Sequence, residues 1–240
     1  MKKTLAFSIP VLRTILFITA GLLLTVITKK TLLEMTRWWT ILCSVVNVIT
    51  IIILAVVLKY EGSSYRELLN YKKGQIKFKN TVIIVFSMLL VGIGGMYAFG
   101  YLIYGYMPTL LIQPVPVWLG IINVIVFPVT IIFAEMPIYF AYSINRIEKF
   151  SGSRVLAFSY CMFFYALQHS FIPLLFDWKY IVFKFLSFLP LMVVLSIIYN
   201  KKRNLAPLMI GHGIMDLATS SQILIMSLFP AVYIMIQQAS

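Results

Sequence analysis

The chain is a succession of apolar segments, each close to the length that crosses a lipid bilayer. Eight can be marked, at residues 8–28, 39–58, 81–106, 118–142, 155–176, 181–199, 205–220 and 222–236. A helix of about 20 apolar residues crosses the hydrocarbon core and satisfies its own backbone hydrogen bonds. No alternating pattern typical of membrane strands is present. The sequence therefore predicts an all-α, polytopic membrane helical bundle of about eight transmembrane helices, with residues 1–240 forming a single integral membrane domain.

Composition separates this chain from soluble proteins. Hydrophobic residues make up 61% of the chain and charged residues 11%, against about half and about a quarter in soluble domains. The net charge is +13, but the basic residues lie between the apolar segments, where the positive-inside rule places them. We therefore expect the lipid bilayer as a partner and no nucleic acid. Cys43 and Cys161 lie in apolar segments and predict neither a disulfide framework nor a zinc motif.

Loop charges predict the orientation of the chain. With the N-terminus inside the cell, fourteen Lys and Arg residues fall on the cytoplasmic side and four on the outer side. Cytoplasmic loops are enriched in these residues, so we expect both termini in the cytoplasm. The one sizeable polar loop, residues 59–80, is typical of a juxtamembrane segment, and a surface that binds acidic lipid or peptide is the alternative.

Glu135 lies in the apolar segment 118–142, which contains no other acidic or basic residue. A carboxylate at that depth costs about 3 kcal/mol or more, and charged residues inside membranes usually serve a function. Pro137 follows two residues later and removes a helix hydrogen bond, which either shapes a site or simply kinks the helix. Glu135 therefore needs partners within the membrane.

Three further ionisable residues of the membrane interior are candidates: His169, His212 and Asp216. Asp216 follows His212 by four residues, so the two side chains share one helix face. Counted from the nearest cytoplasmic basic residues, Glu135, His169 and His212 lie 11, 15 and 9 residues into the membrane. These separations correspond to about 14 to 22 Å along a helix. The depths are compatible with one shared site.

These residue types suit the hydrolysis of a peptide bond. Glu135, helped by His169, could activate a water molecule to attack a peptide carbonyl. His212 and Asp216 could stabilise the oxyanion or position the substrate. Two histidines and two carboxylates are also an acceptable zinc set, with the same four residues as ligands. The HExxH motif is absent, so the sequence leaves open a glutamate mechanism that requires no cofactor and a zinc mechanism.

In their order, three motifs resemble those of the CAAX protease and bacteriocin-processing family (CPBP, or Abi), which are intramembrane proteases. That family carries Glu-Glu-x-x-x-Arg, Phe-x-x-x-His and His-x-x-x-Asn motifs. The corresponding stretches are residues 135–140, 165–169 and 212–216, within a motif region of about residues 80–220. The resemblance implies that Glu135, His169, His212 and Asp216 are catalytic. The chain departs from the family pattern at four positions, with Met136 for the second Glu, Phe140 for the Arg, Tyr165 for the Phe and Asp216 for the Asn.

The resemblance implies an intramembrane endopeptidase of a bacterial cell membrane that acts on a peptide or membrane-protein substrate. One alternative is a catalytically inactive family member that acts by binding, in bacteriocin immunity or as a partner of a peptide exporter. A transporter or proton-relay protein is a third class, because intramembrane Glu and His residues also serve those roles. Met136 and Phe140 replace the Glu and the Arg together, so no orphan charge is left in the first motif.

Overall fold

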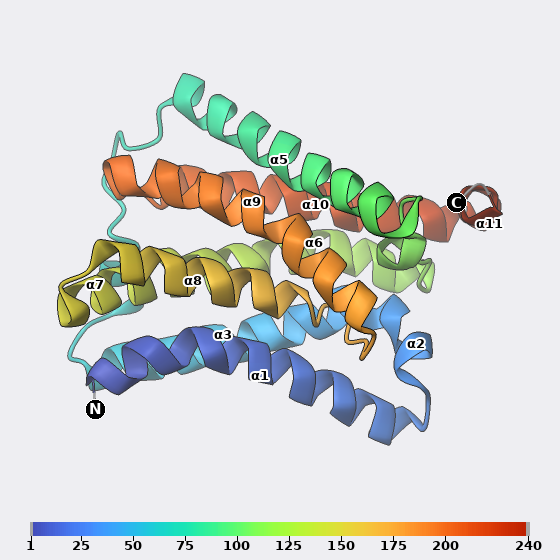
Figure 1. The fold of residues 1–240 in the computed structure, drawn as a ribbon, viewed down its shortest axis with the longest axis horizontal. Helices are drawn as coiled ribbons and strands as arrows, with labels where there is room; N and C mark the ends of the chain where they lie inside the picture. The colour runs from blue at the N-terminus through green and yellow to red at the C-terminus, as the bar shows by residue number, and fades with distance from the viewer. Residues whose placement is uncertain (1, 239–240) are drawn as a thin grey trace.

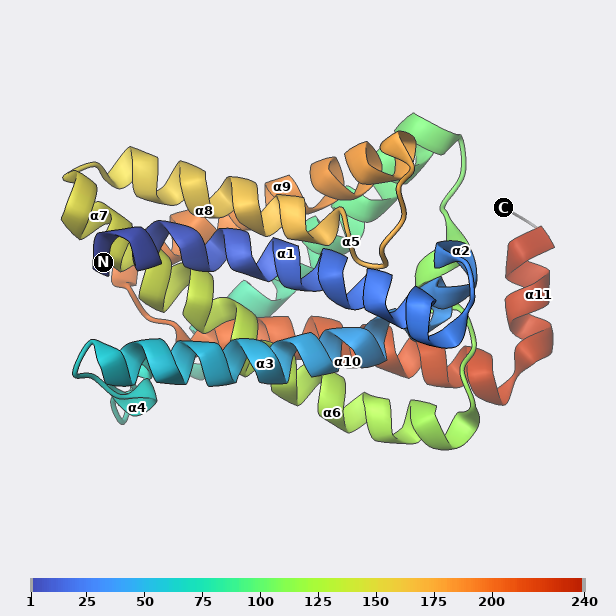
Figure 2. The ribbon, with the colours of Figure 1, turned by 90° about the horizontal axis from the view of Figure 1, so that it is seen from below.

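The computed structural model describes residues 2–238, and every regular element in that range is a helix. The long helices are α1 (Lys2–Thr28), α3 (Trp39–Tyr60), α5 (Phe78–Tyr104), α6 (Val117–Met136), α8 (Arg154–His169), α9 (Trp178–Lys202) and α10 (Ala206–Leu228). The short elements are α2 (Leu32–Met35), η1 (Thr36–Trp38), α4 (Tyr65–Leu69), η2 (Thr109–Ile112), η3 (Pro137–Ile144), α7 (Asn145–Ser151) and α11 (Pro230–Gln238). Figures 1 and 2 show the long helices running side by side along one axis.

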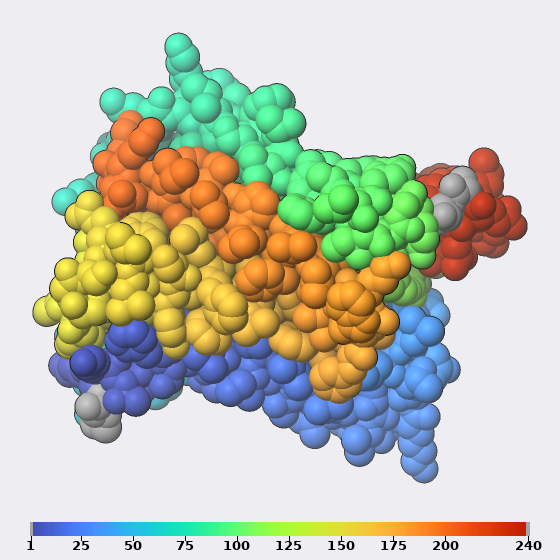
Figure 3. All heavy atoms as spheres, viewed as in Figure 1, coloured from blue at the N-terminus to red at the C-terminus, as the bar shows by residue number. Residues whose placement is uncertain are grey.

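The all-α membrane bundle predicted from the sequence is confirmed. Within residues 2–238, six helical stretches are long and apolar enough to cross a membrane, namely Lys2–Thr28, Leu32–Tyr60, Phe78–Tyr104, Val117–Ser151, Trp178–Lys202 and Ala206–Leu228. Helix α8 has 16 residues and packs against α1 and α9. In the space-filling view, α8 and α9 cover the middle of one face between α1 and α5 (Figure 3).

The last two predicted segments, 205–220 and 222–236, form one long helix and one short helix instead. Helix α10 runs through Ser220 without a break, because the Ser220 hydroxyl donates to the carbonyl oxygen of Asp216 within the helix. Such a hydrogen bond accommodates a polar residue inside a helix. After Phe229, α11 has only nine residues, too few to cross a bilayer. It lies across the end of the bundle (Figure 2).

This difference separates the two ends of the described chain. Lys2 begins α1 at one end of the bundle, and α11 lies at the other end (Figure 1). One uninterrupted α10 replaces two predicted segments, and the cytoplasmic placement of both termini stays a prediction. The polar loop and α7 remain at the same end of the bundle as Lys2 (Figure 2).

The predicted segment 118–142 belongs to a longer continuous helical rod in which the helix type changes along its length. Helix α6 continues without interruption into η3, a π-helix, and then into α7. Pro137 is the first residue of η3, and because proline has no N–H, the carbonyl of Phe133 loses its α-helical donor. The hydroxyl of Tyr65, on α4, donates to that carbonyl oxygen. Pro137 thus marks a local π segment of the kind common at functional sites, and the polar loop contacts the rod there.

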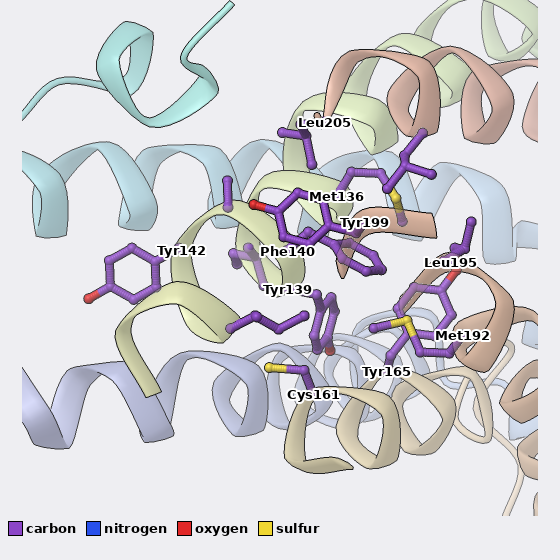
Figure 4. Packing of buried hydrophobic residues seen from close by; sticks show 14 of the residues in the cluster. Met136, Tyr139, Phe140, Tyr142, Cys161, Tyr165, Met192, Leu195, Tyr199 and Leu205 are labelled. Carbon is purple, nitrogen blue, oxygen red and sulfur yellow. The ribbon is translucent and has the colours of Figure 1, made fainter. Parts of the chain in front are cut away.

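The largest buried cluster surrounds the start of η3 (Figure 4). Met136 and Phe140 are both fully buried in it, and the Phe140 ring packs edge-to-face on Tyr199 with centroids 5.2 Å apart. These two residues stand where the resembled family has its second Glu and its Arg. Both positions are therefore part of an apolar core, in agreement with the expectation that no charge is left uncompensated there.

Glycines allow the helices to pack closely around the bundle centre. A β-carbon at Gly95 on α5 would lie 2.5 Å from a carbonyl oxygen of α9. Gly211 and Gly213 on α10 pack in the same way, since a β-carbon there would lie 2.4 Å from the Met88 sulfur and 2.9 Å from the Ile132 side chain, respectively. These α10 glycines therefore serve close packing against α5 and α6, as small residues do in membrane bundles.

Candidate active site

Glu135 lies on the last turn of α6, and none of its surface is exposed. Its two carboxylate oxygens have different surroundings. Oε1 faces the histidines of α8 and α10, and Oε2 faces side chains of α1 and α8. The site therefore has two sides.

On the first side, two imidazole rings approach one oxygen of Glu135. Nε2 of His212 lies 2.8 Å from Oε1, and Nε2 of His169 lies 3.8 Å from the same atom. The first distance is a hydrogen bond, whereas the second is too long for one and suits a small bridging molecule. The structure thus brings together three of the predicted site residues from α6, α8 and α10.

Asp216 approaches the other nitrogen of His212. Its Oδ2 lies 3.2 Å from Nδ1 of His212, as the i,i+4 spacing predicts. Because Nε2 of His212 donates to the Glu135 carboxylate, a neutral ring would present only a lone pair to Asp216. A proton must therefore be held between His212 and Asp216. The three side chains form a carboxylate, imidazole, carboxylate series.

The tautomer of His169 is fixed by its own helix. Nδ1 lies 2.8 Å from the carbonyl oxygen of Tyr165, and because a carbonyl only accepts, Nδ1 carries the proton. In the neutral ring, Nε2 then presents its lone pair toward Glu135. The imidazole also stacks on Phe188 of α9 with centroids 3.9 Å apart. His169 is thereby oriented as a proton acceptor.

On the second side, Oε2 of Glu135 accepts hydrogen bonds from Nη2 of Arg13 at 3.1 Å and from Nε2 of Gln168 at 2.8 Å. Arg13 belongs to α1 and is 1% exposed. Its guanidinium also donates to Gln168 Oε1 at 2.7 Å, Asn47 Oδ1 at 2.7 Å and Thr50 Oγ1 at 3.1 Å. A buried ion pair is tolerated when further hydrogen bonds satisfy both groups. This pair meets that condition.

Arg13 and Gln168 are site residues that the sequence patterns did not indicate. Arg13 stands eleven residues after Lys2, which is about 16 Å along a helix. The depth count that joins Glu135 with the histidines therefore applies equally to Arg13 and could have found it. Gln168 carries no charge, and only its position beside His169 points to it.

Tyr165 stands at the position of the second-motif Phe, and its hydroxyl is buried. Its ring packs against His169 and Tyr139, with centroids 4.7 Å and 5.4 Å away. Within the described residues, the Tyr165 hydroxyl lies near the Glu135 carboxylate but forms no hydrogen bond of good geometry. A buried hydroxyl that is incompletely hydrogen-bonded costs free energy, so this group is a candidate to bind a reacting molecule.

The four predicted residues do not converge on one point as zinc ligands would. Glu135 contacts Nε2 of His212, whereas Asp216 contacts Nδ1 on the other edge of the same ring. The two carboxylates are therefore separated by an imidazole, and the first of them is already bonded to a guanidinium. Among residues 2–238, no group of three His, Cys, Asp or Glu side chains has the geometry to hold a metal ion.

Comparison with known proteins bears on the region that holds this site. Residues 113–218 match a family model described as Type II CAAX prenyl endopeptidase Rce1-like. No curated protein and no solved structure matches the chain. The matched region includes α6, η3, α8 and most of α10, whereas Arg13 lies outside it. The resemblance to the CAAX protease family is therefore confirmed for the region that carries Glu135, His169, His212 and Asp216.

Proposed function

We propose that this chain is an intramembrane endopeptidase in which Glu135 and His169 activate a water molecule. One observation carries the proposal: the two carboxylate oxygens of Glu135 have different hydrogen-bond partners. Oε2 is fixed by Arg13 and Gln168, and Oε1 faces two imidazole nitrogens. A carboxylate held at one oxygen and free to exchange a proton at the other is suited to general base catalysis.

The reaction starts with a water molecule hydrogen-bonded to Oε1 of Glu135 and to the Nε2 lone pair of His169. As the water oxygen attacks the peptide carbonyl carbon, its proton passes to Glu135. The C–N bond then breaks, and Glu135 gives this proton to the leaving amine. The products are a carboxylic acid and an amine, and Glu135 returns to its ionised state.

His212 supplies a donor for the negative charge that develops on the carbonyl oxygen. Its Nε2–H bonds Glu135 at the outset, and a protonated Glu135 accepts that bond less strongly. The N–H is then available to the oxyanion. Asp216 supports this role by sharing a proton with Nδ1 of His212. The buried hydroxyl of Tyr165 offers a second donor beside His169.

The test compares purified wild type with Glu135→Gln on a library of membrane-tethered peptides, with and without a chelator. We expect cleavage by wild type alone, unaffected by the chelator. Glu148→Gln is the matched control, because Glu148 is also ion-paired, to Arg154 and Arg203, but lies on α7. Loss of cleavage on chelation would overturn the glutamate mechanism, and equal cleavage by Glu135→Gln would overturn the enzyme assignment.

The binding-only alternative predicts a different outcome for the same variants. A catalytically inactive immunity protein or exporter partner would keep its full biological effect in Glu135→Gln and in His212→Ala. We expect both variants to lose that effect while remaining folded in the membrane. Retention of the effect in both would favour the binding role over the peptidase.

We also propose that the end of the bundle that holds Lys2 faces the cytoplasm of a bacterial cell. Supporting this orientation, the polar loop 59–80 and α7 gather basic residues at that end. Reporter fusions after residue 75 and after Gln238 test it. We expect a cytoplasmic signal from the first and, because α11 lies at the other end of the bundle from Lys2, an external signal from the second. A cytoplasmic signal from the second fusion would contradict this orientation.

A further inference from the structure

At the end of the bundle that holds Lys2, one hydrogen bond joins two basic segments that are far apart in the sequence. The side-chain amide of Asn204, between α9 and α10, donates to the carbonyl oxygen of Gln75 in the polar loop at 3.0 Å. In Figure 1, the trace that leads into α5 passes the junction of α9 and α10 at this end. Residues 129 positions apart therefore contribute to one surface.

Five lysines lie within three residues of this hydrogen bond, and all five side chains are exposed. A residue spans at most about 3.6 Å of chain, so their α-carbons lie within about 11 Å of the α-carbon of Gln75 or of Asn204. The set will be called the lysine patch and consists of Lys72, Lys73, Lys77, Lys201 and Lys202.

The three acidic side chains at this end are engaged elsewhere. Glu61 pairs with Arg146, and Glu148 pairs with Arg203. Glu67 accepts hydrogen bonds within the capping box that begins α4. Within residues 2–238, no ammonium group of the lysine patch forms an ion pair. The patch therefore presents five positive charges that no acid of the described chain compensates.

The backbone on both sides of the lysine patch is fixed. The amide of Gln75 donates to the carbonyl oxygen of Lys72 at 3.1 Å, which closes a turn in which Gly74 has a φ of +85°. Helix α9 ends before Arg203, whose guanidinium donates to Glu148 of α7 at 2.6 Å. The two halves of the patch are thus in place before a ligand binds, which lowers the cost of binding.

Exposed apolar side chains lie among the lysines of the loop. Tyr71, Ile76 and Phe78 are all exposed, Phe78 by 84%. Lys77 directly precedes α5 and Lys202 ends α9, and both helices are long and apolar enough to cross a membrane. The patch therefore lies where these helices leave the bilayer, and basic residues next to exposed apolar ones suit the boundary between headgroups and acyl chains. This combination favours a lipid ligand over a soluble acidic peptide, which needs no apolar neighbours.

We propose that the lysine patch binds the phosphate-bearing headgroups of anionic phospholipids, and that the hydrogen bond from Asn204 assembles this site. Basic clusters next to a transmembrane helix attract anionic lipid, by about fivefold in affinity for each lysine. Each ammonium offers up to three donors to phosphate oxygens. The binding does not depend on the proposed peptidase function, and it applies to either orientation of the bundle.

Native mass spectrometry of the purified full chain in a neutral detergent tests the site by counting bound lipid. The probes are phosphatidylglycerol and phosphatidylcholine with the same acyl chains. We expect wild type to bind phosphatidylglycerol about tenfold more tightly or better, and the double variant Lys201→Gln, Lys202→Gln to lose about fivefold or more of that preference. The matched control is Lys3→Gln with Lys149→Gln, which removes two exposed charges at the same end but outside the patch and should leave the preference unchanged.

Asn204→Ser tests the assembly of the patch without changing its charge. Serine keeps an acceptor for the amide of Ala206, which Asn204 bonds at 3.3 Å, but it is too short to reach Gln75. We expect the preference for phosphatidylglycerol to fall about threefold, in line with the loss of one hydrogen bond. The unfolding temperature should stay close to that of wild type, which shows that the bundle is intact.

Three outcomes would overturn the proposal. Equal affinity of wild type for the two lipids would remove the site, and equal losses in the Lys201, Lys202 variant and its control would reduce it to general surface charge. An unchanged preference in Asn204→Ser would show that the two segments do not act together. Tighter binding of a soluble Glu-rich peptide than of phosphatidylglycerol, if lost in the Lys201, Lys202 variant, would assign the patch to an acidic protein partner instead.

Discussion

The two sides of Glu135 are built differently, although they belong to one carboxylate. Around Oε2, all three guanidinium nitrogens of Arg13 donate hydrogen bonds, and Arg13, Gln168, Asn47 and Thr50 hold one another in place. Around Oε1, the contacts are fewer and longer, with Nε2 of His169 at 3.8 Å from Oε1 and Asp216 at 3.2 Å from Nδ1 of His212. The first group will be called the framework side and the second the reactive side. The difference indicates that one side fixes the carboxylate and the other exchanges protons.

The two buried basic residues repeat this contrast. The guanidinium of Arg13 is planar and carries several donors, which suits a network of fixed acceptors. It donates hydrogen bonds to side chains of three neighbouring helices. Lys184 on α9, which is 2% exposed, presents a single charged group over the ring of Phe188. If the contrast is functional, framework substitutions should lower stability and activity together, whereas reactive-side substitutions should lower activity alone.

Arg13→Met should have the largest effect. It leaves the Glu135 carboxylate buried without its counter-charge, at a cost of about 3–5 kcal/mol in the free energy of unfolding, and cleavage should be lost as well. The measurement is thermal unfolding in detergent together with peptide cleavage. Combining Arg13→Met with Glu135→Gln should restore most of the stability and none of the activity.

Arg154→Met provides the control for this substitution. Its side chain is 61% exposed, and its pair with Glu148 lies at the surface, so the loss should stay below about 1 kcal/mol. Wild-type stability in Arg13→Met would remove the framework role from Arg13 and leave the two sides of Glu135 without a functional distinction.

His169→Gln should have the second largest effect, on activity only. Loss of the imidazole that helps Glu135 to activate the water lowers the rate by about 10²- to 10⁴-fold. The His169 side chain is not part of the framework side, so stability should change little. Its unfolding temperature should stay close to that of wild type. Activity and unfolding temperature should be measured on the same preparation. A loss of stability that parallels the loss of activity would place His169 on the framework side instead.

Asp216→Asn should have a smaller effect than Asp216→Ala. An Asn amide can donate to Nδ1 of His212 and so hold the ring with its proton on Nε2, and the resembled family has Asn at this position. We expect the Asn variant to stay within about tenfold of wild type in kcat/KM, with the Ala variant well below it. Equal losses in both would show that the charge of Asp216, rather than its hold on His212, is required.

Tyr65→Phe should have the smallest effect. It removes only the hydroxyl that donates to the Phe133 carbonyl, which is worth about 0.5–1.5 kcal/mol. Limited proteolysis within residues 61–77 should become faster, with cleavage activity little changed. A large loss of activity would instead show that the contact between α4 and the rod holds Glu135 in register.

The fold class and the meeting of Glu135, His169 and His212 could be predicted because membrane depth can be counted along a helix. Asp216 followed from helical spacing alone. Arg13 lies on a helix far away in sequence, and no local pattern links it to Glu135. The π-helix could not be predicted either. Pro137 indicates that the α-helix is interrupted, but it does not indicate which type of helix follows. The division of 205–236 was misplaced because hydropathy treats Ser220 as a loop residue, whereas its hydroxyl bonds within the helix.

The buried guanidinium has a consequence for how the protein is made. Arg13 is synthesised 122 residues before Glu135, so the first helix must enter the bilayer without its counter-charge, at a cost of about 3 kcal/mol. Asn47 and Thr50 are inserted next, on α3, and their side chains provide neutral hydrogen-bond acceptors for the Arg13 guanidinium. Insertion of α6 then completes the pair. The last step of building this site is therefore also a late step of membrane assembly, and a nascent chain stopped before α6 should remain a target for membrane quality control.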